Sequence, residues 1–356
     1  MANNNKHTGP NVPALRFPEF GGEWEKKCLG DISENISSGK TKSTTTGGKY
    51  VLIGSTGVIG NTSNADYSGN LILVARVGAN AGLINYYSGD CGITDNTLII
   101  KPLEQEKNFC HYVYHYLKHC NLNQFVFGSG QPLITGGMLK RLPIRYGTAD
   151  EINKLSSLFD LLDARIEAQS KIIEEQETLL KSLADSLISS QVANMALNDC
   201  VVARSSTMKE SELENPGPFP VFGASGLCGY SNEALEESDS ILVTKDGSGV
   251  GTCQYATGAH SFLGTLCSLT AKEGVYLPYV YYALLNFNFA SFKTGLAIPH
   301  IYFKDYGKAI IYCPSYDEQV RIASGLEKIE AKIKSDKDLL KQYQLQKEYL
   351  LSRMFI

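Results

Sequence analysis

The sequence contains no Cys-x-x-Cys pair, which excludes a zinc knuckle and a dithiol redox motif. An odd number of cysteines without regular spacing also gives no sign of a disulfide framework. We therefore expect reduced thiols, as in a cytoplasmic protein. The nine cysteines lie at positions 28, 91, 110, 120, 200, 228, 253, 267 and 313.

Long apolar runs are missing as well, so no segment is predicted to span a membrane. The first residues, MANNNKHTG, are polar and lack the apolar stretch of a secretory signal. The hydrophobic fraction of 43% and the mean hydropathy of −0.14 are typical of a soluble globular chain. We expect a cytoplasmic protein with no membrane partner.

Positive charge is not in excess, because 33 Lys and Arg stand against 37 Asp and Glu, for a net charge of −4. Any surface that binds nucleic acid must therefore come from local clustering of cations.

Catalytic motifs are absent too. The segment Gly-Ser-Gly-Val-Gly at 247–251 is not followed by Lys-Ser or Lys-Thr, so it is no phosphate loop. The segment Asn-Pro-Gly-Pro-Phe at 215–219 only superficially resembles the Asn/Asp-Pro-Pro-aromatic loop of DNA methyltransferases. We expect no catalytic residue and no cofactor on this chain.

What the sequence does contain is a long stretch, from Asp150 to Leu187, with apolar residues at alternating steps of three and four, apart from two steps that Gln169 and Gln176 fill. The average period of 3.5 is typical of a coiled coil. Because no Pro or Gly interrupts the stretch, it predicts one helix roughly 50 Å long. The apolar positions are Ile152, Leu155, Phe159, Leu162, Ile166, Ile173, Leu180, Leu183 and Leu187.

The same spacing recurs 167 residues later. Gln169 and Asp336 place a polar residue at the same step of both copies, and a buried polar position commonly fixes helix register. Two unrelated surface helices are the alternative, but the repeat extends beyond the helices. The second series is Ile322, Leu326, Ile329, Ile333, Asp336, Leu340, Tyr343, Leu350 and Met354.

The segments that precede the two helices also repeat. GSTGVIG at 54–60 matches GASGLCG at 223–229, and ILVARVG at 72–78 matches ILVTKDG at 241–247, each pair 169 residues apart. Strands are expected at 51–53, 71–74 and 97–100, a helix at 109–119 that corresponds to 278–286, and a turn at 128–134. The chain is therefore a tandem duplication.

We predict an α+β fold in which two similar target domains of mixed α/β structure are separated by two long helices. A compact second domain returns the chain near its starting point, so the helices are expected to form an antiparallel coiled coil with pseudo-twofold symmetry. The predicted parts are an N-terminal arm at 1–27, domains at 28–147 and 196–313, and long helices at 148–195 and 314–356.

Two similar but non-identical modules held apart suit DNA with two half-sites, which twofold readers recognise about 34–36 Å apart or at multiples of that. Different readers imply an asymmetric, split site. Two alternatives stay open: a coiled-coil scaffold whose modules bind protein or ligand, and a self-contained nuclease or methylase. Binding that weakens steeply with salt would distinguish DNA recognition from a scaffold.

A family resemblance points the same way. The opening Val-Pro-Ala-Leu-Arg-Phe-Pro-Glu-Phe at 12–20, with Glu-Trp-Glu at 23–25 and Leu-Gly-Asp at 29–31, resembles the start of type I restriction–modification specificity subunits. Gly-Ser-Gly-Gln-Pro at 128–132 and Pro314-x-x-Asp317-Glu318-Gln319 are similar too, and the resemblance covers essentially the whole chain. The first helix instead has Pro143 followed by Asp150-Glu151-Ile152, and the second domain starts without a Trp.

The resemblance implies a non-catalytic subunit that binds double-stranded DNA through two target-recognition domains. It further implies two methyltransferase subunits as partners, with S-adenosylmethionine bound by them, and restriction/translocase subunits for cleavage.

Candidate DNA contacts follow from charge and from the repeat. The first domain (28–147) holds ten Lys or Arg and seven acids. Arg76 and Lys245 share a repeat position before a glycine turn and could reach guanine edges or phosphate. Plain surface charge is the alternative for each. Phosphate contacts are predicted for Lys40, Lys42, Lys49, Arg204 and Lys209; weaker candidates are Ser55, Asn80, Gln131, Ser225, Ser248 and His300.

His111, His115, His119 and Cys120 lie at steps of four on one predicted helix, and two His at i and i+4 can hold zinc. The matching helix has Tyr279, Tyr282 and Ala283 there and no His. The sequence therefore favours no metal site.

Overall fold

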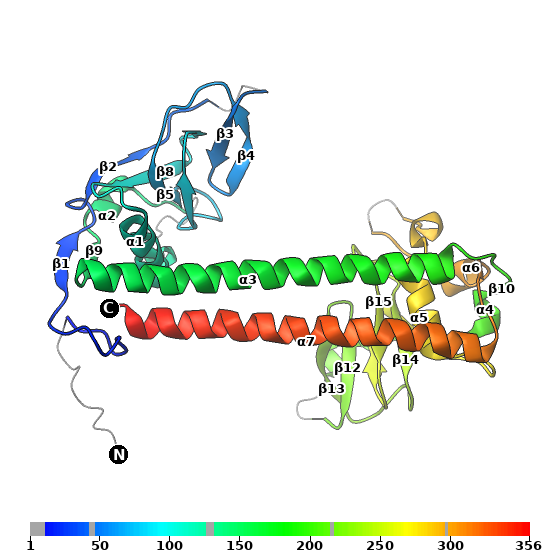
Figure 1. The fold of residues 1–356 in the computed structure, drawn as a ribbon. Helices are drawn as coiled ribbons and strands as arrows, with labels where there is room; N and C mark the ends of the chain where they lie inside the picture. The colour runs from blue at the N-terminus through cyan, green and yellow to red at the C-terminus, as the bar shows by residue number, and fades with distance from the viewer. Residues whose placement is uncertain (1–10, 43–46, 126–131, 214–216, 296–297) are drawn as a thin grey trace, which may run out of the picture. The chain divides into compact units, whose positions relative to one another are not determined.

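The computed structural model describes residues 11–42, 47–125, 132–213, 217–295 and 298–356. It divides into two compact units, one of residues 1–169 with 339–356 and one of residues 170–338. Both long helices cross the boundary, so each unit holds part of each helix and one set of short strands (Figure 1). We call these unit 1 and unit 2. Residues 128–131 of the predicted turn lie outside the described residues.

Unit 1 is built on a four-stranded sheet in the order β2-β8-β5-β6, beside a three-stranded sheet β4-β3-β7 and a pair β1-β9. All pairs are antiparallel except β3 with β7. The strands are β1 (Glu25–Cys28), β2 (Ser33–Ser38), β3 (Tyr50–Gly54), β4 (Gly57–Thr62), β5 (Asn70–Ala75), β6 (Ile84–Ser88), β7 (Cys91–Ile93), β8 (Thr97–Pro102) and β9 (Pro143–Tyr146).

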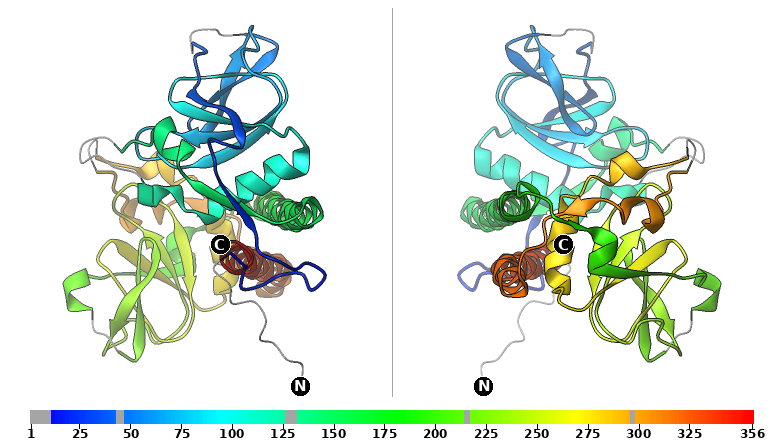
Figure 2. Two further views of the ribbon diagram at one scale, coloured as in Figure 1. Left: turned by 90° about the vertical axis from the view of Figure 1, so that its left-hand side faces the viewer. Right: turned by 90° about the vertical axis from the view of Figure 1, so that its right-hand side faces the viewer.

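Strand β5 is apolar on both faces because both are covered. Ile72 and Val74 pack into the large core with the helices, while Leu71 and Leu73 pack into a smaller core with β3 and β7. This alternation is the two-residue period of a strand. Helix α1 (Lys107–His119) lies between this sheet and the long helix α3 (Ala149–Ala184), as Figure 2 shows at left, and α2 (Gly136–Lys140) precedes β9.

Unit 2 repeats this arrangement strand by strand, with sheets β11-β17-β14-β15 and β13-β12-β16 and a pair β10-β18. Its helix α5 (Leu277–Leu285) corresponds to α1. The remaining elements are β10 (Met195–Ala196), α4 (Leu197–Cys200), β11 (Val201–Ser205), β12 (Phe219–Gly223), β13 (Gly226–Ser231), β14 (Ser240–Thr244), β15 (Cys253–Ala256), β16 (Ser261–Phe262), β17 (Leu266–Ala271), α6 (Phe303–Tyr306), β18 (Ile310–Ile311) and α7 (Tyr316–Met354).

The long helices α3 and α7 pack together and run antiparallel. In unit 1 Phe159 stacks on Phe355 at 5.3 Å and Arg165 lies over the ring of Tyr343, so residue numbers rise along one helix and fall along the other. In unit 2 the buried Asp336 accepts a hydrogen bond of 2.9 Å from Gln176. The predicted polar position is therefore satisfied across the seam.

One predicted seam residue is wrong. Leu187 is 40% exposed, whereas the neighbouring Ile188 is 2% exposed. The helix ends in a π-helical turn at Asp185–Ser189, and the wider turn shifts the buried face by one residue. The other predicted positions are buried or half-buried, including Ile166, Ile329 and Leu340.

The described part of the N-terminal arm, from residue 11 onward, packs on α3 and contains no helix. Arg16 Nε and Nη2 donate to the Glu151 carboxylate at 2.6 and 2.7 Å, and Trp24 Nε1 donates to it at 3.1 Å. Leu15 N donates to Arg353 O of α7 at 2.8 Å. All of these residues lie in unit 1. The arm thereby joins the first domain to both long helices.

The predicted strands at 51–53, 71–74 and 97–100 are confirmed within β3, β5 and β8, and the helix at 109–119 within α1. Within the described part of the chain, no helix is both long and apolar enough to cross a bilayer.

Candidate nucleic-acid interface

The loop after β5 is pinned on two sides. Arg76 N donates to Asn96 O, and Arg76 O accepts from Ile134 N, both at 2.9 Å. Gly78, with φ of 81°, adds a bond of 3.0 Å from its N–H to Pro132 O. The half-buried Arg76 side chain makes no hydrogen bond or ion pair with the described residues. The backbone of Arg76 is thus held in place at the end of a strand, while its guanidinium group is left available for a ligand.

Unit 2 builds the same loop around Lys245. Its N–H donates to Thr265 O, and its carbonyl accepts from Ile301 N, both at 2.9 Å. Gly247 N donates to Pro299 O at 3.0 Å. Arg76 and Lys245 therefore occupy equivalent places, as the repeat predicts, and each has a polar neighbour on its loop, Asn80 or Ser248, that is exposed.

His300 distinguishes the second loop from the first. Its Nδ1 lies 2.6 Å from Asp246 Oδ1, whereas the matching bridge in unit 1 joins Val77 and Leu133. A carboxylate beside Lys245 lowers the local positive potential. The two loops thus share a backbone but differ in chemistry. Gln131, the candidate beside Pro132, lies outside the described residues.

The hairpins β3–β4 and β12–β13 turn through two residues each, between Gly54 and Gly57 and between Gly223 and Gly226. Ser55 is the first turn residue in unit 1, and Ser225 is the second turn residue in unit 2. In unit 2 Gln254 Nε2 donates to Gly223 O at 3.0 Å, which ties the hairpin to β15. Both hydroxyls lie at the tips of hairpins rather than on the loops of Arg76 and Lys245.

The basic stretch after β2 is partly anchored. Lys40 and Lys42 are exposed and flank Thr41, whose buried hydroxyl donates to Asp66 Oδ2 at 2.5 Å. Lys49 is also exposed and lies 5.6 Å from the ring centroid of Tyr50. Because Thr41 is anchored, the backbone positions of the two neighbouring lysines are fixed, while their ammonium groups remain exposed and could contact phosphate.

One candidate side chain in unit 2, that of Arg204, is engaged in other contacts, whereas Lys209 is held through its backbone. The Arg204 guanidinium donates to Leu235 O and lies 3.9 Å from Glu236 Oε2. Lys209 precedes a short 3-10 turn at Glu210–Glu212, and its N–H donates to Glu212 Oε2 at 3.0 Å. Arg204 would have to leave its carbonyl before it could bind phosphate.

Sequence reasoning overlooked Asn96 and Thr265. Each lies opposite the cation of its unit, because β8 and β17 begin where β5 and β14 end. Both side chains are exposed. Only the strand pairing reveals this proximity, because Asn96 and Thr265 each lie twenty residues from the cation of their unit along the chain.

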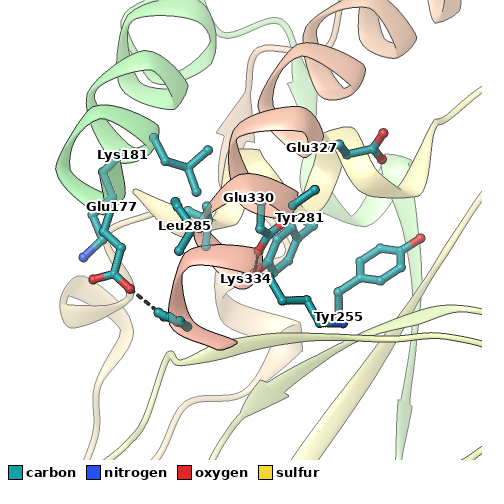
Figure 3. A pocket seen from close by; sticks show the side chains of 12 residues that line it. Glu177, Lys181, Tyr255, Tyr281, Leu285, Glu327, Glu330 and Lys334 are labelled. Atoms are coloured by element: carbon teal, nitrogen blue, oxygen red, sulfur yellow. Dashed lines mark hydrogen bonds and ion pairs between the residues drawn. The ribbon is translucent and has the colours of Figure 1, made fainter. Parts of the chain in front are cut away.

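A hollow of about 680 Å³ lies beside α7 in unit 2. Figure 3 shows Tyr281 beside Glu330, and Tyr281 and Tyr282 donate to that carboxylate at 3.1 and 2.7 Å. Burial, together with the carboxylate, raises the pKa of Tyr282, so its hydroxyl stays protonated and donates. Three acids and three lysines balance the charge of the lining, which does not suit phosphate: Glu177, Glu327, Glu330, Lys181, Lys334 and Lys337.

Two copies of one mixed α/β domain, each followed by a long coiled-coil helix, define a tandem-repeat class of protein. The solved S subunit of a type I restriction–modification system from M. genitalium has this fold, with a TM-score of 0.70 and 20% identity over 97% of this chain and 99% of that one. A structure described as showing complex assembly and conformational transition of the type I R-M system aligns with a TM-score of 0.54 and 12% identity, over 93% and 97% of the two chains.

Residues 21–178 and 190–344 each match the type I restriction modification DNA specificity domain, so the chain belongs to that family. Such domains are the non-catalytic, DNA-specifying part of these systems. The specificity subunit of the type I restriction enzyme EcoprrI from Escherichia coli is 24% identical over 159 residues. That match covers 42% of this chain and 38% of the relative, so it spans well under half of the curated relative's length.

Proposed function

We propose that the chain recognises an asymmetric, bipartite DNA sequence, with residues 28–147 reading one part and residues 196–313 the other. The observation that carries this is the equivalence of Arg76 and Lys245, two cations on the same pinned loop of one repeated fold. The loops differ in neighbours, Asn80 against the His300–Asp246 pair, so the two domains should prefer different bases.

Arg76, Lys245 and the polar side chains on their loops are proposed to contact base edges, since planar guanidinium and amide groups suit base recognition. Lys40, Lys42, Lys49 and Lys209 are proposed to contact phosphates. Arg204 joins them only after releasing Leu235 O.

We further propose that catalysis belongs to partners: two methyltransferase subunits, which bind S-adenosylmethionine, and restriction/translocase subunits. Exposed apolar residues on α3, namely Leu161, Ile172 and Leu179, support a protein-facing surface on this helix. The nine free cysteines agree with action in the cytoplasm.

The test is DNA binding by the full chain over a range of salt concentrations. Affinity should fall steeply with salt, and Arg76→Gln and Lys245→Gln should each weaken binding about tenfold. Lys341→Gln, an exposed cation on α7, is the charge-matched control and should bind like the parent. Salt-independent binding, or equal losses in all three variants, would support the scaffold alternative instead.

A further inference from the structure

Three potential metal ligands meet in unit 1, between α1 and α3. Asp160 Oδ1 lies 2.6 Å from His111 Nδ1 and 3.0 Å from His115 Nε2. The three ligand atoms all lie within 4.8 Å of one another. His111 and His115 are one helical turn apart, and the aspartate comes from α3, 45 residues further along the chain.

Hydrogen bonding alone satisfies this cluster poorly. If both rings donate to Asp160 Oδ1, the opposite nitrogens, His111 Nε2 and His115 Nδ1, carry lone pairs, and both atoms are buried without a hydrogen-bond partner. His115 Nδ1 also faces Asp163 Oδ2 at 3.9 Å, so a lone pair points at a carboxylate. Buried polar atoms left unpaired in this way destabilise a fold.

A bound cation would remove the repulsion between the lone pair of His115 Nδ1 and the Asp163 carboxylate. With His115 Nε2 on a metal, Nδ1 carries the proton and points it toward Asp163, the usual outer carboxylate of a metal-bound histidine. Burial lowers the pKa of the wholly buried His115 below its ordinary 6.5.

The fold itself does not require the cluster. Tyr112 donates to Arg145 O in unit 1, and Tyr279 donates to Tyr312 O in unit 2, so the two tyrosines are equivalent. By the same alignment, His115 corresponds to Tyr282 and Asp163 to Glu330. In unit 2 the same helix contact is made by hydrogen bonds alone, of 3.1 Å from Tyr281 and 2.7 Å from Tyr282 to the Glu330 carboxylate. The histidines of unit 1 thus add something that helix packing does not need.

We propose that His111, His115 and Asp160 bind a divalent transition-metal cation, for which zinc is the best match. Two imidazole nitrogens and one carboxylate are preferred zinc ligands, and the partly exposed His111 and Asp160 leave the fourth position to water. A tetrahedral zinc ion would hold ligand atoms about 3.3 Å apart, so the half-exposed Asp160 must move outward slightly. The metal would fasten the first recognition domain to its helix, independently of DNA recognition.

The experiment uses the full chain, stripped with a chelator and then titrated with Zn²⁺ by calorimetry and with Co²⁺ by visible absorption. One Zn²⁺ should bind per chain, Co²⁺ should give the absorption bands of tetrahedral coordination, and zinc should raise the melting temperature. Asp160→Asn, which keeps the hydrogen bonds, should weaken binding more than about a hundredfold.

Two further variants separate ligation from folding. The pair His115→Tyr with Asp163→Glu transplants the contact of unit 2, and should fold but lose the metal. His119→Gln, on the same helix but outside the cluster, should bind like the parent. The inference is overturned if no stoichiometric zinc binds, or if Asp160→Asn binds as tightly as the parent, or if His119→Gln loses binding equally.

Discussion

Single residues carry the attachment of the N-terminal arm, and Glu151 is central to it. This carboxylate is 1% exposed and accepts hydrogen bonds from both Arg16 and Trp24. A buried ion pair costs desolvation energy to form, but removing one partner leaves the other charge buried and uncompensated. Among the described residues of unit 2, the equivalent Glu318 pairs instead with Arg321 at the surface.

Glu151→Ala should lower the free energy of unfolding by about 3 kcal/mol, since it strands the Arg16 guanidinium. Chemical denaturation of the full chain measures this. Glu167→Ala, an exposed acid on the same helix, should change it by less than about 0.5 kcal/mol. Equal effects of the two substitutions would show that the arm is not anchored through this carboxylate.

The sequence could not predict side-chain contacts between residues that are distant along the chain. Asp160 completes the histidine cluster from another helix, and Leu235 O occupies Arg204 from another strand connection. Charge and spacing identify a cation but not the carbonyl that will hold it. The equivalent places of Arg76 and Lys245 were predictable, because the duplication supplied a second observation.

At the scale of elements, the 3.5-residue period predicted both long helices and most of their buried positions. It failed where the helix changes type, at the π turn of Asp185–Ser189, because apolar residues occupy both 187 and 188 and either register looks acceptable in sequence. The repeated glycine segments at 54–60 and 223–229 form hairpins in the structure, where Gly57 and Gly226 adopt φ above 100°, which favours glycine.

The π turn makes a sharp prediction for two adjacent residues. Ile188→Ala should cost about 2–4 kcal/mol of unfolding free energy, because it empties a buried site. Leu187→Ala should cost less than about 1 kcal/mol, because that side chain is largely in water. Denaturant unfolding of both variants shows which of the two side chains is buried. A larger loss of unfolding free energy for Leu187→Ala than for Ile188→Ala would mean that the heptad pattern continues without interruption.

At the scale of the whole chain, the second domain is as complete as the first. Leu197 and Asn198 donate to Ala309 O and Gly307 O just as Leu29 and Gly30 donate to Leu142 O and Lys140 O. The weak sequence echo of Leu-Gly-Asp in Leu197-Asn198-Asp199 is therefore a true structural equivalence. If both domains read DNA as proposed, the recognised sequence should have two parts.

Exchange of residues 28–147 for the same domain of another family member should therefore alter one part of the recognised sequence only. The helices and the second domain remain, so complex formation and the other part should be preserved. A loss of all modification with an intact, folded chain would indicate that the two domains do not read independently.

The most direct measurement maps methylated bases across the genome of cells that carry the parent chain, the domain-exchanged chain or neither. The account predicts one asymmetric bipartite motif that is methylated only when the chain is present, and in the exchanged strain changes in one of its two parts. Methylation that is unaffected by loss of the chain would contradict the account.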